Sequence, residues 1–328
     1  MVSFGLMALP ASTGRMSGPQ LPTLLQEVDE SNIFRTVWFG EVPPLGRRYP
    51  APDPIVRMAS IATLTRRVRL ALGCLTTFPV RDPLFLASQW ASLDRLAGPG
   101  RLILAACQGE SSRPGSEMQA AAFGIPWGQA RVRRMEEGIE VLRALLCQDR
   151  VTYEGDFLKY TDVSVGPAPI TQPCPPIWIA ANPRKLGGKT GAIDRMVLRV
   201  GRIADGWMTE MLTAEDFADR WQRILDAAEK AGRDPAAIDN ALEYDVCVND
   251  DRDAAYAETK AWHDSFYRRD WEREVLERWV AYGRPDDVAA KLKTYVDAGA
   301  KELCLRLTGT DIDAQLQRLI EDVIPLLN

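Results

Sequence analysis

The chain has 328 residues, of which 46% are hydrophobic and 26% are charged, and its net charge is −5. This composition is typical of a globular protein with enough apolar material for one large core. The acidic balance and the lack of a basic block argue against nucleic acid or an anionic membrane as partners. No apolar run reaches the roughly 20 residues that cross a bilayer. Residues 1–10 are apolar without a basic lead-in, which predicts a first strand rather than a signal peptide.

The chain contains a single histidine, His263, and six scattered cysteines. One histidine excludes histidine-rich zinc or iron centres, so no metal is expected. A serine–histidine–aspartate triad would have to be built on His263, which lies in a charged stretch without a nucleophile-elbow motif. The cysteines show no short paired spacing, which predicts reduced thiols and a cytoplasmic location. Because few side chains suit acid–base chemistry near pH 7, an enzyme of this composition would depend on an organic cofactor.

Apolar runs and helical patterns alternate along the chain. Strands are predicted at residues 2–9, 36–40, 70–77, 101–109, 176–181, 204–208, 242–248 and 303–307. Helices are predicted at residues 20–31, 53–64, 82–97 and 129–146 and at the C-terminus, and Asp53-Pro54 and Asp82-Pro83 are typical helix starts. Eight strands, nearly all followed by helices and without a Gly-rich first crossover, predict one (β/α)8 barrel domain over residues 1–328. In such barrels the chemistry lies where the strands end.

An ordered series of motifs resembles the bacterial luciferase-like family of flavin-dependent oxidoreductases. The helix and strand from Asp82 to Gly109 are the most recognisable stretch. The other motifs follow in the family's order: Glu41, Gly73, Phe123-Gly124, residues 151–157, residues 175–180, residues 204–207, residues 283–288 and residues 298–300. The resemblance implies a TIM barrel with insertions after strands 4, 5 and 7. It also implies FMN or the deazaflavin coenzyme F₄₂₀ bound at the C-terminal ends of the strands.

Three functions follow from this resemblance. The main interpretation is a two-component monooxygenase that receives reduced FMN from a separate NAD(P)H:flavin reductase and uses O₂ on a small organic substrate. The alternative is an F₄₂₀-dependent dehydrogenase or reductase that transfers a hydride, and the third is a flavin-binding barrel without activity. Family barrels pair through their second and third helices, here residues 54–66 and 83–96, so a homodimer or homotetramer is expected.

The resemblance also places the cofactor against particular strand ends. Gly73-Cys74 would form a non-prolyl cis bond or bulge under the ring, although a glycine in a strand can also serve packing alone. Cys107 matches a reactive thiol of luciferase, or is an ordinary core cysteine, and would line the pocket with Gln108 and Gly109. The phosphate would lie on the loop after the fifth strand, or that loop is a solvated surface segment. Its residues are Ala181, Asn182, Pro183, Arg184 and Lys185, and the next candidate for the phosphate is the loop with Ser111, Ser112 and Arg113.

Two positions depart from the family pattern. Val42 stands where the family often has a histidine after Glu41, and Gln108 replaces an arginine of luciferase. The catalytic candidates are therefore Glu41 and Cys107, and a proton could also come from Glu110 or Glu210. Glu41 has an alternative role as a structural partner of a barrel arginine. Residues 251–280, which are charged and aromatic, predict either an amphipathic helix pair or a lid bordering substrate, with His263 near the mouth.

Overall fold

The computed structural model describes residues 2–8, 20–41, 52–109, 121–124, 128–183 and 190–327. They form two compact units. Unit 1 comprises Met1–Trp38 with Ala181–Asn328, and unit 2 comprises Phe39–Ala180. The prediction that residues 1–328 form a single domain stays a prediction.

Eight strands follow one another in a parallel sheet that closes on itself. They are β1 (Ser3–Ala8), β2 (Thr36–Phe39), β3 (Arg69–Leu75), β4 (Leu102–Ala106), β7 (Ile177–Ala180), β8 (Gly206–Glu210), β9 (Asp239–Val248) and β11 (Glu302–Leu307). β11 pairs in parallel with both β1 and β9, and β9 also pairs with β8. All eight correspond to predicted strands, which confirms the (β/α)8 barrel. Their nearly continuous burial is what a parallel sheet covered by helices requires.

Unit 2 holds the second and third helices of the barrel. α2 (Pro54–Ala62) and α3 (Pro83–Ala97) each begin with a proline behind an aspartate cap. The Asp53 carboxylate accepts from the Ile55 N–H at 2.9 Å, and the Asp82 carboxylate accepts from the Leu84 N–H at 2.8 Å. These caps satisfy amides that the helix itself leaves unpaired, so the sequence sets both starts locally.

The insertion after the fourth barrel strand also lies in unit 2. It contains α5 (Gln129–Cys147), which packs against α3, and an antiparallel hairpin of β5 (Val151–Glu154) and β6 (Lys159–Val163). Sequence patterns predicted no strand here, because both strands of the hairpin are short and mostly exposed and therefore carry no apolar run.

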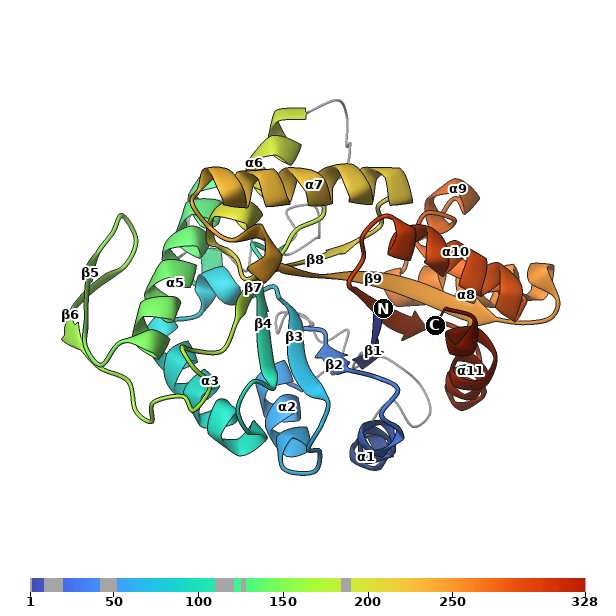
Figure 1. The fold of residues 1–328 in the computed structure, drawn as a ribbon, viewed down its shortest axis with the longest axis horizontal. Helices are drawn as coiled ribbons and strands as arrows, with labels where there is room; N and C mark the ends of the chain where they lie inside the picture. The colour runs from blue at the N-terminus through green and yellow to red at the C-terminus, as the bar shows by residue number, and fades with distance from the viewer. Residues whose placement is uncertain are drawn as a thin grey trace. The chain divides into compact units, whose positions relative to one another are not determined.

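Unit 1 holds the other α-helices that the structure describes (Figure 1). They are α1 (Leu21–Ser31), α6 (Thr190–Ile203), α7 (Ala214–Lys230), α8 (Arg252–Tyr267), α9 (Arg273–Leu276), α10 (Pro285–Asp297) and α11 (Ile312–Arg318). The insertion after β9 contains α8, α9 and a further parallel strand, β10 (Val280–Gly283), which pairs with the edge of β9. The predicted helix pair is therefore one long helix, one single turn and a short strand.

The cysteines correct one prediction. Cys147 at the end of α5 is joined to Cys174 by a disulfide, so the expectation of six reduced thiols is wrong for this pair. Cys74, Cys107, Cys247 and Cys304 take no part in a disulfide. Sequence spacing missed the pair because the two residues meet only after α5 and the proline-rich segment before β7 have packed.

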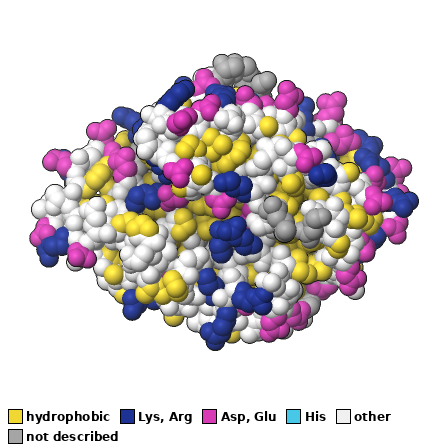
Figure 2. Space-filling view, viewed as in Figure 1, with side chains coloured by type: hydrophobic (Ala, Val, Ile, Leu, Met, Phe, Trp, Pro, Cys, Tyr) yellow, Lys and Arg dark blue, Asp and Glu magenta, His cyan; other side chains and the backbone are white. Residues whose placement is uncertain are grey.

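The charged side chains on the surface are distributed as the composition predicts, without a basic block. Figure 2 shows basic and acidic side chains interspersed on the face that it presents, and no histidine there. None of the helices in the described ranges is long and apolar enough to cross a membrane.

Candidate functional site

Two clusters of polar and ionisable side chains lie at strand ends, one in each unit. In unit 2 the first member is Glu41, which comes just after β2 and is nearly buried. Its Oε2 accepts from Thr76 Oγ1 at 2.8 Å and from the Thr77 N–H at 2.7 Å. Its Oε1 accepts from Thr77 Oγ1 at 2.5 Å and from Arg81 Nη2 at 3.0 Å. Both carboxylate oxygens are thus occupied, and this is the arrangement that the structural alternative for Glu41 predicts.

The second part of the unit 2 cluster is a pair of thiols. The Gly73–Cys74 peptide is cis, and the β3–β4 register shifts between Leu72 and Leu75, so the geometry that the resemblance implied at this point is present. Cys107 follows β4, and its Sγ accepts from the Gly109 N–H at 3.3 Å. The Cys74 thiol donates a second hydrogen bond to it and is the main reason that the pKa of Cys107 is lowered.

Gly109 shapes this strand end. Its φ is +74°, a left-handed conformation that favours glycine. A Cβ there would lie 2.1 Å from Arg131 Nη2 and 3.1 Å from the Thr76 carbonyl oxygen. Glycine therefore lets the Arg131 guanidinium lie against the backbone beside the half-buried thiols. Gln108, which lies between Cys107 and Gly109 in the sequence, is also half-buried.

Several predicted site residues lie outside the described residues. They are Val42, Glu110, Ser111, Ser112, Arg113, Arg184 and Lys185. The roles assigned to them stay predictions.

The described part of the loop after β7 is attached to unit 1. The Asn182 amide donates to Glu210 Oε1 at 3.0 Å, and its carbonyl oxygen accepts from the Glu210 N–H at 3.1 Å. The Ala181 N–H is bonded to the Met208 carbonyl, and Pro183 has no N–H to offer. The Asn182 side chain therefore fixes this loop to the end of β8, and any contact it makes with a phosphate would have to share these bonds.

The second cluster lies on one face of β8, β9 and β11. Trp207 of β8 stacks on Phe217 of α7, and Tyr244 of β9 contacts Tyr295 of α10, so these residues face the helices. Since successive side chains alternate, Glu210, Glu243 and Asp245 lie on the opposite face. Glu210 is level with Glu243, and Asp245 is level with Arg306 of β11.

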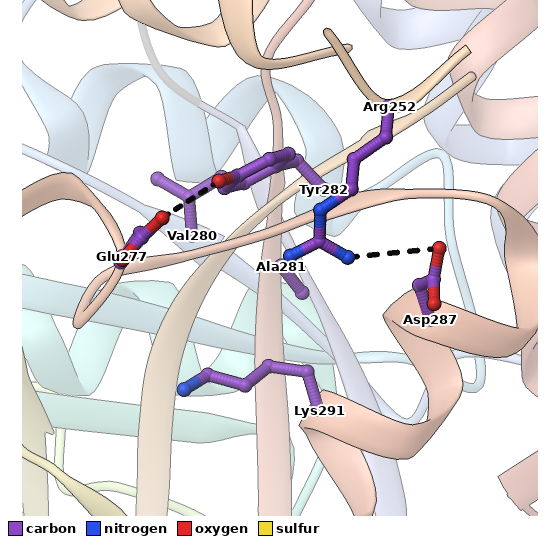
Figure 3. A pocket seen from close by; sticks show the side chains of 7 residues that line it. All are labelled: Arg252, Glu277, Val280, Ala281, Tyr282, Asp287 and Lys291. Carbon is purple, nitrogen blue, oxygen red and sulfur yellow. Dashed lines mark hydrogen bonds and ion pairs between the residues drawn. The ribbon is translucent and has the colours of Figure 1, made fainter. Parts of the chain in front are cut away.

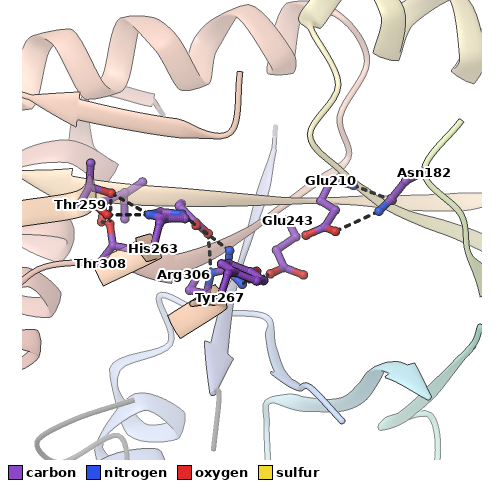
Figure 4. A network of polar contacts seen from close by, with 10 residues as sticks. Asn182, Glu210, Glu243, Thr259, His263, Tyr267, Arg306 and Thr308 are labelled. Carbon is purple, nitrogen blue, oxygen red and sulfur yellow. Dashed lines mark hydrogen bonds and ion pairs between the residues drawn. The ribbon is translucent and has the colours of Figure 1, made fainter. Parts of the chain in front are cut away.

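Arg306 is buried and joins the two acids of β9 (Figure 4). Its Nη1 lies 3.0 Å from Glu243 Oε1, and its Nη2 and Nε each lie 2.6 Å from the oxygens of Asp245. Burial acts to raise the pKa of Asp245, but Arg306 and His263 outweigh it and the pKa is lowered. Asp245 is therefore the permanent carboxylate partner of Arg306.

Glu243 behaves differently. Burial raises its pKa to about 8, Glu210 and Asp245 add to the rise, and Arg306 opposes it. A carboxyl with a pKa near neutrality exchanges a proton under physiological conditions, which ordinary glutamates do not. Glu210, a proton source predicted from the sequence, does lie in this cluster, whereas Glu243 was not predicted. The available signal was a pair of acids, Glu243 and Asp245, two residues apart in an otherwise apolar buried strand.

The prediction that His263 lies near the mouth, as part of a lid, stays a prediction. His263 is completely buried on the inner side of α8. Its Nε2 lies 2.6 Å from Asp245 Oδ2 and its Nδ1 lies 2.7 Å from the Thr259 carbonyl oxygen. The ring thus bridges the Thr259 carbonyl of α8 and Asp245 of β9 and helps orient Asp245 toward Arg306.

Aromatic rings from the insertion after β9 surround this cluster. The Arg306 guanidinium lies 5.1 Å from the ring centre of Trp262 and 5.3 Å from that of Trp279. The Tyr267 hydroxyl lies 3.3 Å from Arg306 Nη1, and burial raises its pKa. Aromatic side chains of residues 251–280 thus shield the charged cluster from water.

A small pocket lies beside β10 in the same unit (Figure 3). Its cations have acidic or aromatic neighbours: Arg252 lies 3.7 Å from Asp287, and Lys291 lies 5.9 Å from the ring centre of Tyr295. The Tyr282 hydroxyl donates to Glu277 at 2.9 Å. Within the described ranges, no group of three or more histidine, cysteine, aspartate or glutamate side chains is arranged to hold a metal ion.

The fold and the two clusters define a (β/α)8-barrel protein with ionisable side chains toward the carboxyl ends of its strands. The family model described as luciferase-like monooxygenase matches residues 27–302. The chain therefore belongs to the luciferase-like monooxygenase family.

Individual relatives are consistent with this assignment. The chain is 28% identical over 299 residues to an F₄₂₀-dependent glucose-6-phosphate dehydrogenase of Kineococcus radiotolerans, with 84% of this chain and 83% of that protein covered. A coenzyme F₄₂₀-dependent tetrahydromethanopterin reductase of Methanopyrus kandleri has the same fold, with a TM-score of 0.76, 21% identity, and 100% and 99% of the two chains covered. A monooxygenase of Streptomyces bottropensis superposes with a TM-score of 0.77 at 25% identity, with 99% of each chain covered.

Proposed function

We propose that this protein is an F₄₂₀-dependent oxidoreductase that transfers a hydride between the deazaflavin and a small alcohol or carbonyl substrate. The observation that carries the proposal is the similarity to F₄₂₀-dependent dehydrogenases over more than four fifths of both chains. It favours the alternative of the sequence interpretation over the FMN monooxygenase. When bound, the deazaflavin would supply the hydride acceptor or donor.

The strand ends of unit 2 fit a flat heteroaromatic ring. Glycine at position 109 lets the Arg131 guanidinium lie against the backbone, and the donor set consists of the Cys74 and Cys107 thiols and this guanidinium. We assign Gly73, Cys74, Cys107 and Gly109 to this contact. The phosphate stays assigned to the segment of Asn182, Arg184 and Lys185, with Ser111, Ser112 and Arg113 as the next candidate.

The residues of unit 1 fit the proton transfer that must accompany hydride transfer. Removing a hydride from an alcohol carbon requires that the hydroxyl proton also leave, and Glu243 is the described carboxyl of this cluster whose pKa is raised to near neutrality. Arg306 holds Glu243 through Oε1, so we assign the proton to Oε2. Asp245 and His263 fix Arg306, and the aromatic rings exclude water. Glu41, which is fully hydrogen-bonded, would position Arg81 and the segment after β3.

The assembly that we propose is a homodimer through α2 and α3 of unit 2. These helices pack on each other and expose large apolar side chains. Val56 is 66% exposed and Phe85 is 73% exposed. Exposed apolar residues on neighbouring helices are typical of a protein interface.

A side-by-side titration tests the cofactor. The protein is titrated with F₄₂₀ and with FMN, and bound F₄₂₀ is then mixed without oxygen with secondary alcohols and aldose phosphates. We expect tighter binding of F₄₂₀ and loss of its visible absorbance with at least one substrate. Preferential binding of FMN with oxygen-dependent turnover, together with a flavin reductase, would restore the monooxygenase interpretation. Binding of neither cofactor would overturn both.

A further inference from the structure

We propose that Cys107 and Cys74 form a peroxide-reactive thiol pair, in which Cys107 is oxidised first and Cys74 then closes a disulfide with it. The proposal concerns a modification site and goes beyond the proposed hydride transfer. It requires no bound cofactor, so it can be tested separately.

The two thiols meet because β3 and β4 are neighbouring strands. The Cys107 N–H donates to the Leu75 carbonyl at 3.2 Å, and the strand register shifts at Cys74, between Leu72 and Leu75. This places the Cys74 thiol where it donates a hydrogen bond to Cys107 Sγ. Because Leu75 is level with Ala106, Cys74 and Cys107 are not directly opposite each other, and their thiols approach diagonally across the two strands. A disulfide needs Cα atoms about 4.4–6.8 Å apart, so closing the link draws the ends of β3 and β4 together.

Hydrogen-bond donors and a cation surround the sulfur of Cys107. The Gly109 N–H reaches Sγ at 3.3 Å, and the positive φ of Gly109 is what turns this amide back toward the strand end. Arg131 is the nearby cation and favours the thiolate, whereas burial and the charge of Glu41 oppose it. Glu41 is itself paired with Arg81 at 3.0 Å, which reduces its influence.

The other cysteines lack this environment. Burial raises the pKa of Cys247 to about 12 and that of Cys304 well above its ordinary value. Cys147 and Cys174 are already joined to each other. Cys74 and Cys107 are half-buried, whereas Cys247 and Cys304 are fully buried. Since the thiolate is the nucleophile, Cys107 is the thiol that an oxidant should reach and attack first.

The chemistry balances with a hydroperoxide, such as hydrogen peroxide, as oxidant. The Cys107 thiolate attacks one peroxide oxygen, so that an S–O bond forms, the O–O bond breaks, and water leaves after protonation. Cys74 loses its proton and attacks the sulfenic sulfur, which forms the S–S bond and releases a second water. Two thiols are thus oxidised while one peroxide is reduced to two molecules of water.

Peptide mapping tests the pair directly. The whole protein is treated with hydrogen peroxide, blocked with N-ethylmaleimide and digested with trypsin without reductant. The cleavage sites place Cys74 in residues 70–81 and Cys107 in residues 102–131, apart from the peptides of the other cysteines. We expect these two peptides to be linked after peroxide treatment and separated by dithiothreitol. A persistent absence of the linked peptide would overturn the proposal.

Variants separate the roles of the two thiols. Cys74→Ser should prevent the link and leave Cys107 as a sulfenic acid that dimedone captures. Cys107→Ser should abolish both products and leave Cys74 reduced. Cys247→Ala, which alters a buried thiol elsewhere, is the matched control and should leave the link unchanged. Equal loss of the link in Cys247→Ala would show that the pairing is not specific.

Alkylation of the untreated protein provides a readout that needs no variant. We expect the rate of Cys107 labelling by iodoacetamide to show a pH midpoint below the 8.5 or so of a free thiol, and at least about tenfold faster labelling than at Cys247 at neutral pH. In Cys74→Ser the pH midpoint of Cys107 labelling should move, because the Cys74 thiol is the hydrogen-bond donor that contributes most to lowering the pKa of Cys107. A Cys107 midpoint at or above that of a free thiol would refute the proposal even if the variants fail to fold.

Discussion

Replacing Glu243 with glutamine tests both the stability and the activity assigned to this residue. The change keeps the shape of the side chain and removes its ionisation. In the folded protein burial raises the pKa of Glu243 from an ordinary 4.5 to about 8. One pKa unit corresponds to about 1.4 kcal/mol, so keeping this carboxyl ionisable lowers stability by a few kcal/mol at high pH.

The sign of the pH dependence follows from where the proton is held. Between about pH 4.5 and pH 8 the unfolded chain releases the Glu243 proton while the folded protein keeps it, so wild-type stability falls as the pH rises through this window. Glutamine has no such proton, so Glu243→Gln does not lose this stability as the pH rises. Its gain in free energy of unfolding should therefore be small near pH 4.5, increase up to about pH 8, and then stay constant.

Activity should change in the opposite direction. Loss of a general acid or base typically slows turnover by about 10²–10⁴-fold. In the wild type, alcohol oxidation should increase as the pH rises through about 8 and carbonyl reduction should decrease, because the first needs the carboxylate and the second the acid. Both pH dependences should vanish in Glu243→Gln.

Urea unfolding at several pH values and turnover with F₄₂₀ provide the two measurements. Glu277→Gln is the matched control, since Arg273 and Tyr282 lower the pKa of that carboxyl and it lies in the pocket beside β10. It should gain no stability with rising pH and should retain activity. Glu243→Gln with wild-type turnover and an unchanged pH profile would refute the assignment of the proton to Glu243.

Three further changes test the loop after β7, the end of β4 and the assembly. Asn182→Asp removes a donor from Glu210 and adds a like charge, so cofactor affinity should fall by about one to two decades. Adding Glu210→Gln should restore it if Asn182 positions the loop, but not if the aspartate repels a phosphate. Gly109→Ala should destabilise the fold by about 1–3 kcal/mol in thermal unfolding, because its Cβ would meet Arg131, and more than Gly124→Ala, which has a similar φ and open space. Phe85→Lys should give the mass of one chain in light scattering if α3 forms the dimer contact. The alternative is an unchanged dimer, which would place the interface elsewhere.

Much of the fold and part of the site follow from local sequence. Asp53-Pro54 and Asp82-Pro83 start helices by capping them, which needs no distant contact. The cis peptide at Gly73–Cys74 lies where the resemblance placed a cis bond or bulge. Residues such as Val42 and Lys185 lie outside the described ranges, so their roles stay predictions.

Local sequence patterns did not predict the charged cluster of unit 1. Asp245 and Arg306 are 61 residues apart, and His263 comes from a helix in the insertion between them. Only the parallel register of β9 and β11 makes Asp245 level with Arg306 and turns Glu243 to the same face. The order of strands and the helix starts were thus determined by the sequence through short-range patterns. The pKa of Glu243, the burial of His263 and the Cys147–Cys174 disulfide were decided by tertiary packing, because burial and charge contacts exist only once distant segments meet.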